Sequence, residues 1–215
     1  MEVTTLVFDL DGTLSDPSTG IINCVNYALK TCGYETQSDR NISAEIGPPL
    51  DLMFNKFIAG LTPDGMNELV VAYRERFNTD GFAENILYKD IPATLNTLQN
   101  SGFRLGVCTS KPERPARKIL EHFNLLHQFE FVSGGDIGVT KQSQLQRLLD
   151  NKDIDQNAVM IGDRGVDLIA AHNNGLRSVG VLWGFGSRRE LAEQNPVLMI
   201  DTVPELLSSF KVSTP

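Results

Sequence analysis

Short apolar segments alternate along this chain with stretches of helical periodicity. The apolar segments span residues 5–8, 103–108, 129–132, 158–161, 178–181 and 197–200. Helices are expected between and after the later segments, at residues 91–101, 112–122, 141–149, 165–173, 188–193 and 204–210. Strands that alternate with helices are typical of βαβ units, which build a mainly parallel sheet covered by helices. The predicted fold class is therefore α/β with a mainly parallel sheet.

The alternation is interrupted after the first apolar segment. Between about residues 15 and 88 the sequence shows helical periodicity and no clear strand. Asp16 before Pro17 and Thr62 before Pro63 each place a capping side chain ahead of a proline, which is a helix start signal. We expect a helical cap domain at residues 16–88, inserted into a core domain made of residues 1–15 and 89–215.

The charge balance and the cysteines narrow the class of protein. With 19 Lys and Arg against 27 Asp and Glu, the net charge of −8 disfavours binding of a nucleic acid polymer. Cys24, Cys32 and Cys108 lack metal-site spacing and are expected to be small buried side chains in a reducing compartment. Residues 1–4 carry no basic region or long apolar stretch, so a cytoplasmic protein without a membrane segment is expected.

Two carboxylates, Asp9 and Asp11, follow directly on the first predicted strand. Open α/β sheets bind ligands in the crevice at the carboxyl ends of their strands. On a sharp turn at Gly12, the pair can supply a nucleophile, a proton-transfer group and oxygen ligands for a hard cation. The alternative is an acidic turn without chemistry, because Asp-Gly is common in turns. A calcium loop is excluded, because the twelfth residue from Asp9 is Gly20 rather than an acid.

Groups that suit phosphate follow two later segments. Thr109 and Ser110 lie at a strand end before a helix, where hydroxyls and backbone N–H groups bind phosphate oxygens, although a simple helix cap is the alternative. Lys141 opens a predicted helix, a position that the helix dipole disfavours for a cation. This position indicates a further purpose for Lys141, with an ordinary surface lysine as the alternative.

A second acidic pair, Asp163 and Asp167, lies at the start of the next helix with a spacing that sets both on one side. A pair of helix caps is the alternative interpretation. If these acids meet Asp9 and Asp11, charges about 4 Å apart repel by about 4 kcal/mol at an effective dielectric near 20. Such a cluster requires a cation, and ligands that are all oxygen favour Mg²⁺ over zinc.

The segments Asp9-Leu10-Asp11-Gly12-Thr13 and Gly162-Asp163 through Asp167, with Thr109 and Lys141 between them, resemble the four motifs of the haloacid dehalogenase superfamily of phosphohydrolases. The resemblance extends over nearly the whole chain. It implies a Rossmann-like core with a helical cap inserted after the first strand. Within this branch the chain resembles phosphoglycolate phosphatases and bacterial 5′-nucleotidases, the latter through residues 46–50 and 180–186.

The resemblance also implies roles for individual residues. Asp9 becomes an aspartyl phosphate, and Asp11 protonates the leaving oxygen and then activates water. Thr109 and Lys141 hold the phosphoryl oxygens, and Ser110 is a further phosphate-binding candidate. Mg²⁺ is held by Asp9, the carbonyl of Asp11, Asp163 and Asp167. The cap residues expected to face the leaving group are Gly47, Pro48, Pro49 and Lys56.

The expected function is a Mg²⁺-dependent phosphatase of small phosphorylated metabolites or nucleoside monophosphates, active as a monomer or homodimer. A phosphomutase on the same scaffold is one alternative. A receiver module that is phosphorylated on Asp is another, although a receiver carries its acceptor after a central strand and lacks an insert of ~70 residues. A dehalogenase is disfavoured, because such enzymes lack the second acid that Asp11 supplies.

Overall fold

The computed structural model describes residues 3–136 and 138–210. Within these residues, parallel strands form a six-stranded sheet in the order β5-β4-β1-β6-β7-β8. The strands are β1 (Thr5–Phe8), β4 (Arg104–Thr109), β5 (Phe131–Gly134), β6 (Val159–Gly162), β7 (Arg177–Val181) and β8 (Leu198–Ile200). The predicted α/β class with a parallel sheet is confirmed, and the expected strand positions are correct to within two residues.

Strand β1 lies in the middle of the sheet and is buried on both faces. Its side chains alternate, as the two-residue period of a strand requires. Leu6 and Phe8 belong to the larger of two apolar clusters, which also contains Leu95 of helix α5 (Ile91–Asn100). Val7 belongs to the other cluster, together with Leu145 of helix α7 (Lys141–Asp150). A strand with apolar residues on both faces is suited to a sheet covered by helices on both sides.

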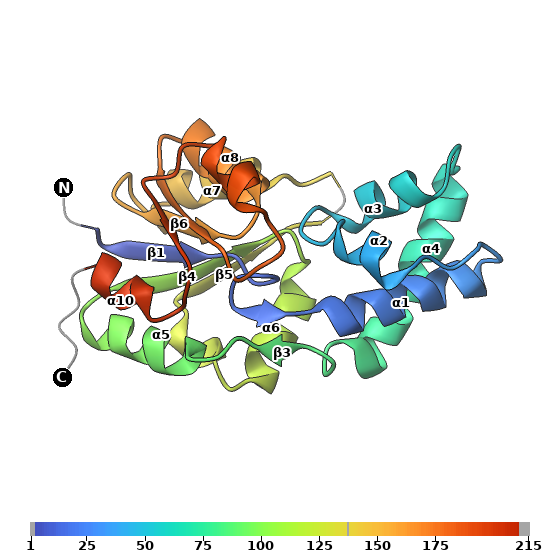
Figure 1. The fold of residues 1–215 in the computed structure, drawn as a ribbon, viewed down its shortest axis with the longest axis horizontal. Helices are drawn as coiled ribbons and strands as arrows, with labels where there is room; N and C mark the ends of the chain where they lie inside the picture. The colour runs from blue at the N-terminus through green and yellow to red at the C-terminus, as the bar shows by residue number, and fades with distance from the viewer. Residues whose placement is uncertain (1–2, 137, 211–215) are drawn as a thin grey trace.

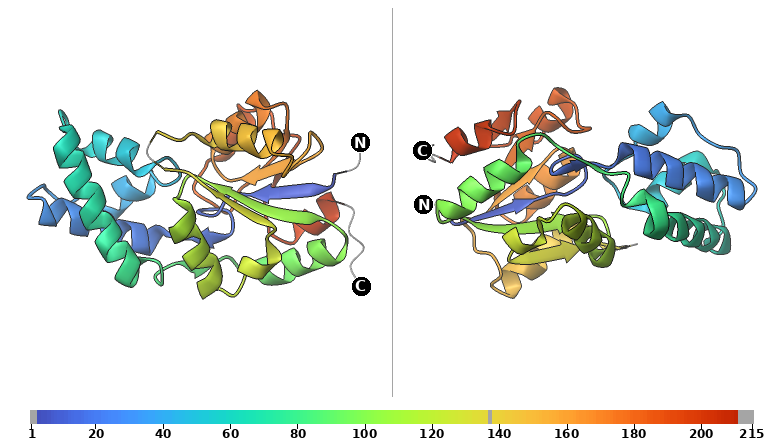
Figure 2. Two further views of the ribbon diagram at one scale, coloured as in Figure 1. Left: turned by 180° about the vertical axis from the view of Figure 1, so that it is seen from behind. Right: turned by 90° about the horizontal axis from the view of Figure 1, so that it is seen from below.

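The helices of the core lie on the two faces of this sheet (Figure 1). They are α5 (Ile91–Asn100), α6 (Glu113–His122), α7 (Lys141–Asp150), α8 (Gly165–Asn173), α9 (Arg188–Ala192) and α10 (Glu205–Ser209), with a short 3₁₀ turn η2 (Leu126–Gln128). Helices α7 and α8 cover one face, and α5 and α10 lie on the opposite side, as Figures 1 and 2 show. All six predicted helices of this part of the chain are present.

A separate group of helices lies beyond the carboxyl ends of the strands (Figures 1 and 2). It comprises α1 (Ser18–Thr31), α2 (Asp39–Ser43), α3 (Leu50–Phe57) and α4 (Pro63–Arg76), followed by a π-helical turn η1 (Phe77–Gly81). Thr62 caps α4, because its hydroxyl accepts the Gly65 N–H at 3.1 Å. At α1 the cap is shifted by one residue: Pro17 is the N-cap, and Asp16 accepts the Ser18 N–H at 2.8 Å.

The expectation that residues 15–88 contain no strand is wrong. Strand β2 (Ser15–Asp16) pairs antiparallel with β3 (Ile86–Leu87) at the two ends of this segment. Two-residue strands are too short to show the alternation by which strands are recognised in a sequence. Their pairing places the two connections between the helical group and the sheet side by side, next to Asp11.

Among the described residues, no helix has the length and apolar character needed to cross a membrane.

Candidate active site

Asp9 and Asp11 lie at the carboxyl end of the central strand β1. The Asp9 N–H donates to the Ile161 carbonyl of β6 at 2.9 Å, so the strand pairing continues to the first acid. The chain then turns at Gly12, whose φ is +89°, and a Cβ at this position would overlap the Asp163 carboxylate. Only 3% of Asp9 and 9% of Asp11 is exposed. A positive φ and a close approach therefore both require glycine after the second acid.

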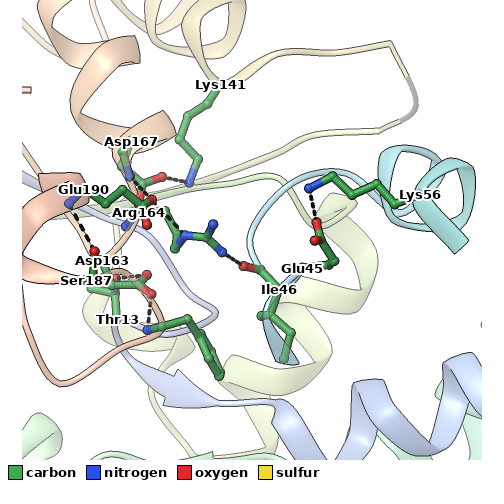
Figure 3. A network of polar contacts seen from close by, with 12 residues as sticks. Thr13, Glu45, Ile46, Lys56, Lys141, Asp163, Arg164, Asp167, Ser187 and Glu190 are labelled. Atoms are coloured by element: carbon green, nitrogen blue, oxygen red, sulfur yellow. Dashed lines mark hydrogen bonds and ion pairs between the residues drawn. The ribbon is translucent and has the colours of Figure 1, made fainter. Parts of the chain in front are cut away.

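Lys141 lies between the carboxylates of Asp9 and Asp167, and Figure 3 shows its contact with Asp167. Its Nζ is 2.9 Å from Asp9 Oδ1 and 2.5 Å from Asp167 Oδ1, and all three side chains are buried. Burial by itself lowers the pKa of Lys141, but the carboxylates of Asp167 and Asp9 outweigh it and raise the pKa. These contacts explain why a lysine occupies the first position of α7 against the helix dipole.

Asp163 is fully buried just before α8, and it is held by two donors from other segments. Its Oδ1 accepts the Thr13 hydroxyl at 3.2 Å, and its Oδ2 accepts the Phe185 N–H at 2.8 Å. Burial and the nearby charges of Asp167 and Asp9 raise the pKa of Asp163 to about 8. In the absence of a cation, the protonated form of Asp163 is therefore favoured up to neutral pH.

Asp167 lies in the first turn of α8, where its Oδ2 accepts the Arg164 N–H at 3.0 Å. Burial raises the pKa of Asp167 to about 6, although Lys141 acts in the opposite direction. A Cβ on Gly162 would overlap this carboxylate, so the backbone at the end of β6 packs directly against it. The predicted pair is thus divided between the end of the strand and the first helical turn.

The acids from the two ends of the chain converge. One carboxylate oxygen from each of Asp9, Asp163 and Asp167 lies within 4.8 Å of the other two, and all three residues are buried. In the described part of the chain, Asp11 Oδ1 is buried without a hydrogen-bond partner, whereas Asp9 Oδ1 contacts the Lys141 ammonium. A buried carboxylate oxygen without a donor, beside a cluster whose candidate ligands are all oxygen, matches the requirements of Mg²⁺.

The end of β4 supplies the groups on the other side of Asp9. Thr109 is 1% exposed, and its hydroxyl accepts the Lys111 N–H at 3.3 Å. The Nζ of Lys111 lies 2.9 Å from Asp11 Oδ2 and 4.7 Å from the centroid of the Phe77 ring in η1. No role was predicted for Lys111 from the sequence. The sequence feature that could have indicated a role for Lys111 is its position directly after the hydroxyl pair Thr109 and Ser110, at the end of a buried strand.

A cavity of about 70 Å³ lies over these groups. Its floor comes from the ends of β1 and β4 and comprises Asp9, Asp11, Thr109, Ser110 and Lys111. Its roof comes from the helical group and comprises Ile21, Ile46, Gly47, Pro48, Pro49, Leu50, Met53 and Tyr73. The two parts of the chain therefore enclose one space directly above the acidic pair.

Three of the four predicted cap residues line this cavity, namely Gly47, Pro48 and Pro49. Lys56 is not among its lining residues. Its Nζ lies 2.5 Å from Glu45 Oε2, and its side chain is 61% exposed, as Figure 3 shows at the edge of the site. Of the predicted cap residues, those in the loop before α3 therefore reach the cavity, and the lysine within α3 does not.

Comparisons with known proteins agree with this geometry. Residues 6–181 match the model of the haloacid dehalogenase-like hydrolase family. A curated relative, the 5′-nucleotidase of Pseudomonas aeruginosa, is 38% identical over 195 residues, which cover 89% of this chain and 88% of that protein. The phosphoglycolate phosphatase of Vibrio parahaemolyticus is 27% identical over 223 residues, covering 99% of this chain and 98% of that protein.

Solved structures show the same relationship. The crystal structure of a predicted phosphatase from Clostridium acetobutylicum has a TM-score of 0.91 at 33% identity and covers 98% of this chain and 99% of its own. The protein tyrosine kinase A of Mycobacterium tuberculosis has a TM-score of 0.82 at 32% identity, covering 99% of this chain and 100% of its own. This chain belongs to the haloacid dehalogenase-like hydrolases. The expected family and enzyme class are confirmed, and relatives named phosphatases support phosphatase activity.

Proposed function

We propose that this hydrolase is a Mg²⁺-dependent phosphatase that cleaves small phosphate monoesters through an aspartyl phosphate on Asp9. The observation that supports the proposal most strongly is the position of Asp9. Asp9 belongs to the acidic cluster that it forms with Asp163 and Asp167, and it also lines the small cavity. A phosphoryl group in that cavity would lie next to the nucleophile Asp9. The buried ammonium of Lys141 and the acids proposed to hold Mg²⁺ adjoin the same carboxylate.

In the first step, an oxygen of Asp9 attacks phosphorus and the bond from phosphorus to the ester oxygen breaks. Protonated Asp11 donates its proton to the departing oxygen, which leaves as an alcohol. In the second step, Asp11 takes a proton from water as the water oxygen attacks phosphorus. The bond between phosphorus and Asp9 breaks, which releases inorganic phosphate and restores both acids.

Positive charge and hydrogen-bond donors stabilise the phosphoryl oxygens. Lys141 contacts Asp9 directly, and the Thr109 and Ser110 hydroxyls line the cavity. Mg²⁺ would be held by Asp9, the backbone carbonyl of Asp11, Asp163 and Asp167, and when bound it would stabilise negative charge on the transferring group. Lys141 also offsets charge between Asp9 and Asp167, so the acids can remain close together.

The leaving group requires more space than the first cavity offers. At about 70 Å³ the first cavity is far smaller than the roughly 300–1,000 Å³ of typical small-molecule pockets. A second cavity of about 250 Å³ shares Leu50, Tyr73 and Lys111 with the first as lining residues. We propose that the leaving group passes this shared boundary and lies in the second cavity, between α4 and α6.

The test is a panel of glycolate, nucleoside and sugar phosphates with and without Mg²⁺, in wild-type protein and Asp9→Asn. We expect Mg²⁺-dependent release of phosphate on at least one ester and its loss in Asp9→Asn, while Asp39→Asn, on the surface of α2, stays active. Undiminished turnover in Asp9→Asn, or no turnover on any ester with Mg²⁺, would refute the proposal. If nucleoside monophosphates are the substrates, they will have a higher kcat/KM than phosphoglycolate.

The same panel decides between hydrolase and phosphomutase, because a mutase returns phosphate to a second hydroxyl of a sugar instead of releasing it. The family match argues against the receiver module. A receiver takes up one phosphate per chain, whereas the proposed enzyme releases many.

We also propose a cytoplasmic location, which free Cys24, Cys32 and Cys108 support.

A further inference from the structure

Arg164 connects the acidic cluster with the loop that covers the catalytic cavity. It lies between Asp163 and Asp167 in the sequence and is the N-cap residue of α8. Its Nη1 donates a hydrogen bond to the carbonyl of Ile46, which is 118 residues away in the helical group. Figure 3 shows the guanidinium pointing from the side of α8 toward this carbonyl.

Glu190 fixes the direction of the Arg164 side chain. Its Oε1 accepts the Arg164 Nε–H at 3.0 Å and the Gly165 N–H at 2.7 Å. Glu190 is itself positioned in the first turn of α9, where its N–H donates to the Ser187 hydroxyl at 3.1 Å. Partial burial opposes ionisation of Glu190, but these donors and the guanidinium lower its pKa, so the acid is charged at neutral pH.

The loop is shaped to accept this arginine. Ile46 is fully buried and lines the catalytic cavity, as does Gly47. Gly47 has φ +122°, and a Cβ there would come within 3.0 Å of the Arg164 Cγ and 3.4 Å of its Nη1. The methylene stem of Arg164 therefore packs against the glycine backbone while the guanidinium bonds to the preceding carbonyl.

We infer that Arg164 is a positioning residue that holds the loop 46–49 over the catalytic cavity, and that Glu190 orients it for this purpose. One end of the arginine is anchored between the acids of the cluster, and the other end holds the roof above Asp9. A single side chain thus determines how far the roof lies from the nucleophile. The part of this inference that concerns substrates rests on the proposed phosphatase function.

The first test measures the loop without activity. In metal-free protein, hydrogen–deuterium exchange of residues 45–47 is expected to become about tenfold faster in Arg164→Ala, while the amides of α4 keep their wild-type rates. Glu190→Ala should change the same amides in the same direction. Glu190→Gln should stay close to wild type, because an amide oxygen can accept both hydrogen bonds.

The second test separates positioning from general destabilisation. In Arg164→Ala we expect the KM for para-nitrophenyl phosphate to rise about tenfold, whereas the KM for acetyl phosphate, with its smaller leaving group, changes less than about threefold. A lysine can bond to either Glu190 or the Ile46 carbonyl but not to both. The KM of Arg164→Lys for para-nitrophenyl phosphate should therefore lie between those of the wild type and Arg164→Ala. Arg189→Ala is the matched control, because Arg189 lies next to Glu190 on α9 but its side chain is 90% exposed and pairs with Glu193.

Unchanged exchange at residues 45–47 in both Arg164→Ala and Glu190→Ala would overturn the inference, whatever the enzyme's substrate. Equal changes for both esters would also overturn it, because a merely structural role affects all substrates alike. Absence of turnover in the wild-type protein would instead contradict the proposed function. The exchange experiment would still decide the role of Arg164 in that case.

Discussion

The ammonium group of Lys111 lies 2.9 Å from Asp11 Oδ2, and both side chains are largely buried. The same lysine lies 4.7 Å above the ring of Phe77, which belongs to the helical group. One cation from the sheet edge therefore contacts both the proposed acid and the helical group. Because Asp11 Oδ1 has no hydrogen-bond partner in the described part of the chain, Lys111 is the main restraint on the direction of this carboxylate.

Replacement of Lys111 by methionine should lower kcat/KM for alkyl phosphates by about 10²-fold, which is the lower end of the range for general acid catalysis. Esters of para-nitrophenol should lose less, because their leaving oxygen departs with little need for a proton. The measurement is kcat/KM for both ester types in the variant, with Lys30→Met on the surface of α1 as the control. An equal loss on both types would contradict the assigned role.

Arg114 lines the second cavity and makes no ion pair or hydrogen bond with any described residue. If the leaving group lies there, Arg114→Gln should reduce kcat/KM about fivefold for phosphoglycolate, which corresponds to about 1 kcal/mol for a partly exposed charge pair. The neutral analogue 2-hydroxyethyl phosphate should be unaffected. Arg117→Gln is the control, because Arg117 pairs with Glu113 on the same helix at 2.7 Å. Equal losses for the two esters would argue against a charge contact.

The turn after the acids offers a test based on two glycines with similar backbone angles. Gly12 and Gly102 have φ values of +89° and +91°, but a Cβ meets the Asp163 carboxylate only at Gly12. Gly102→Ala should therefore cost only the strain of the backbone angle, on the order of 1 kcal/mol. Gly12→Ala should destabilise more and weaken Mg²⁺ binding, as measured by denaturant unfolding and calorimetric titration. Equal stability and equal Mg²⁺ affinity of the two variants would contradict the prediction, because the Asp163 carboxylate would then accommodate the added methyl group without cost.

Metal-free protein should become less stable as the pH rises from about 4 to 8. Burial raises the pKa of Asp163 to about 8 and of Asp167 to about 6, so in this window the folded state binds more protons than the unfolded state. The free energy of unfolding then falls with pH, by at most about 1.4 kcal/mol per proton and pH unit.

The check is urea denaturation across this range in EDTA, for wild type and Asp163→Asn. The variant should show a shallower fall than the wild type, because its amide does not titrate. Added Mg²⁺ should stabilise the wild type increasingly toward pH 8, by about 2.7 kcal/mol at a concentration of 100 times Kd. A wild-type curve that runs parallel to that of Asp163→Asn would be inconsistent with the raised pKa.

The sequence alone determined the parallel sheet, its helices and the acids at the ends of its strands. Burial of β1 on both faces and the alternation of strands with helices are local patterns, and each can be read within a window of a few residues. Because carboxyl ends of parallel strands share one edge, residues as distant as Asp9 and Asp163 could be expected to meet. The structure brings them together as expected.

Only the tertiary structure decided which side chains bridge the sheet edge and the helical group. The pairing of β2 with β3, the contact of Lys111 with Asp11 and the bond from Arg164 to Ile46 left no periodic signal in the sequence. Each depends on the distance and angle at which the helical group packs against the sheet. These quantities are set by the sum of many long-range contacts, so the partner of a long charged side chain is fixed only when the whole chain has folded.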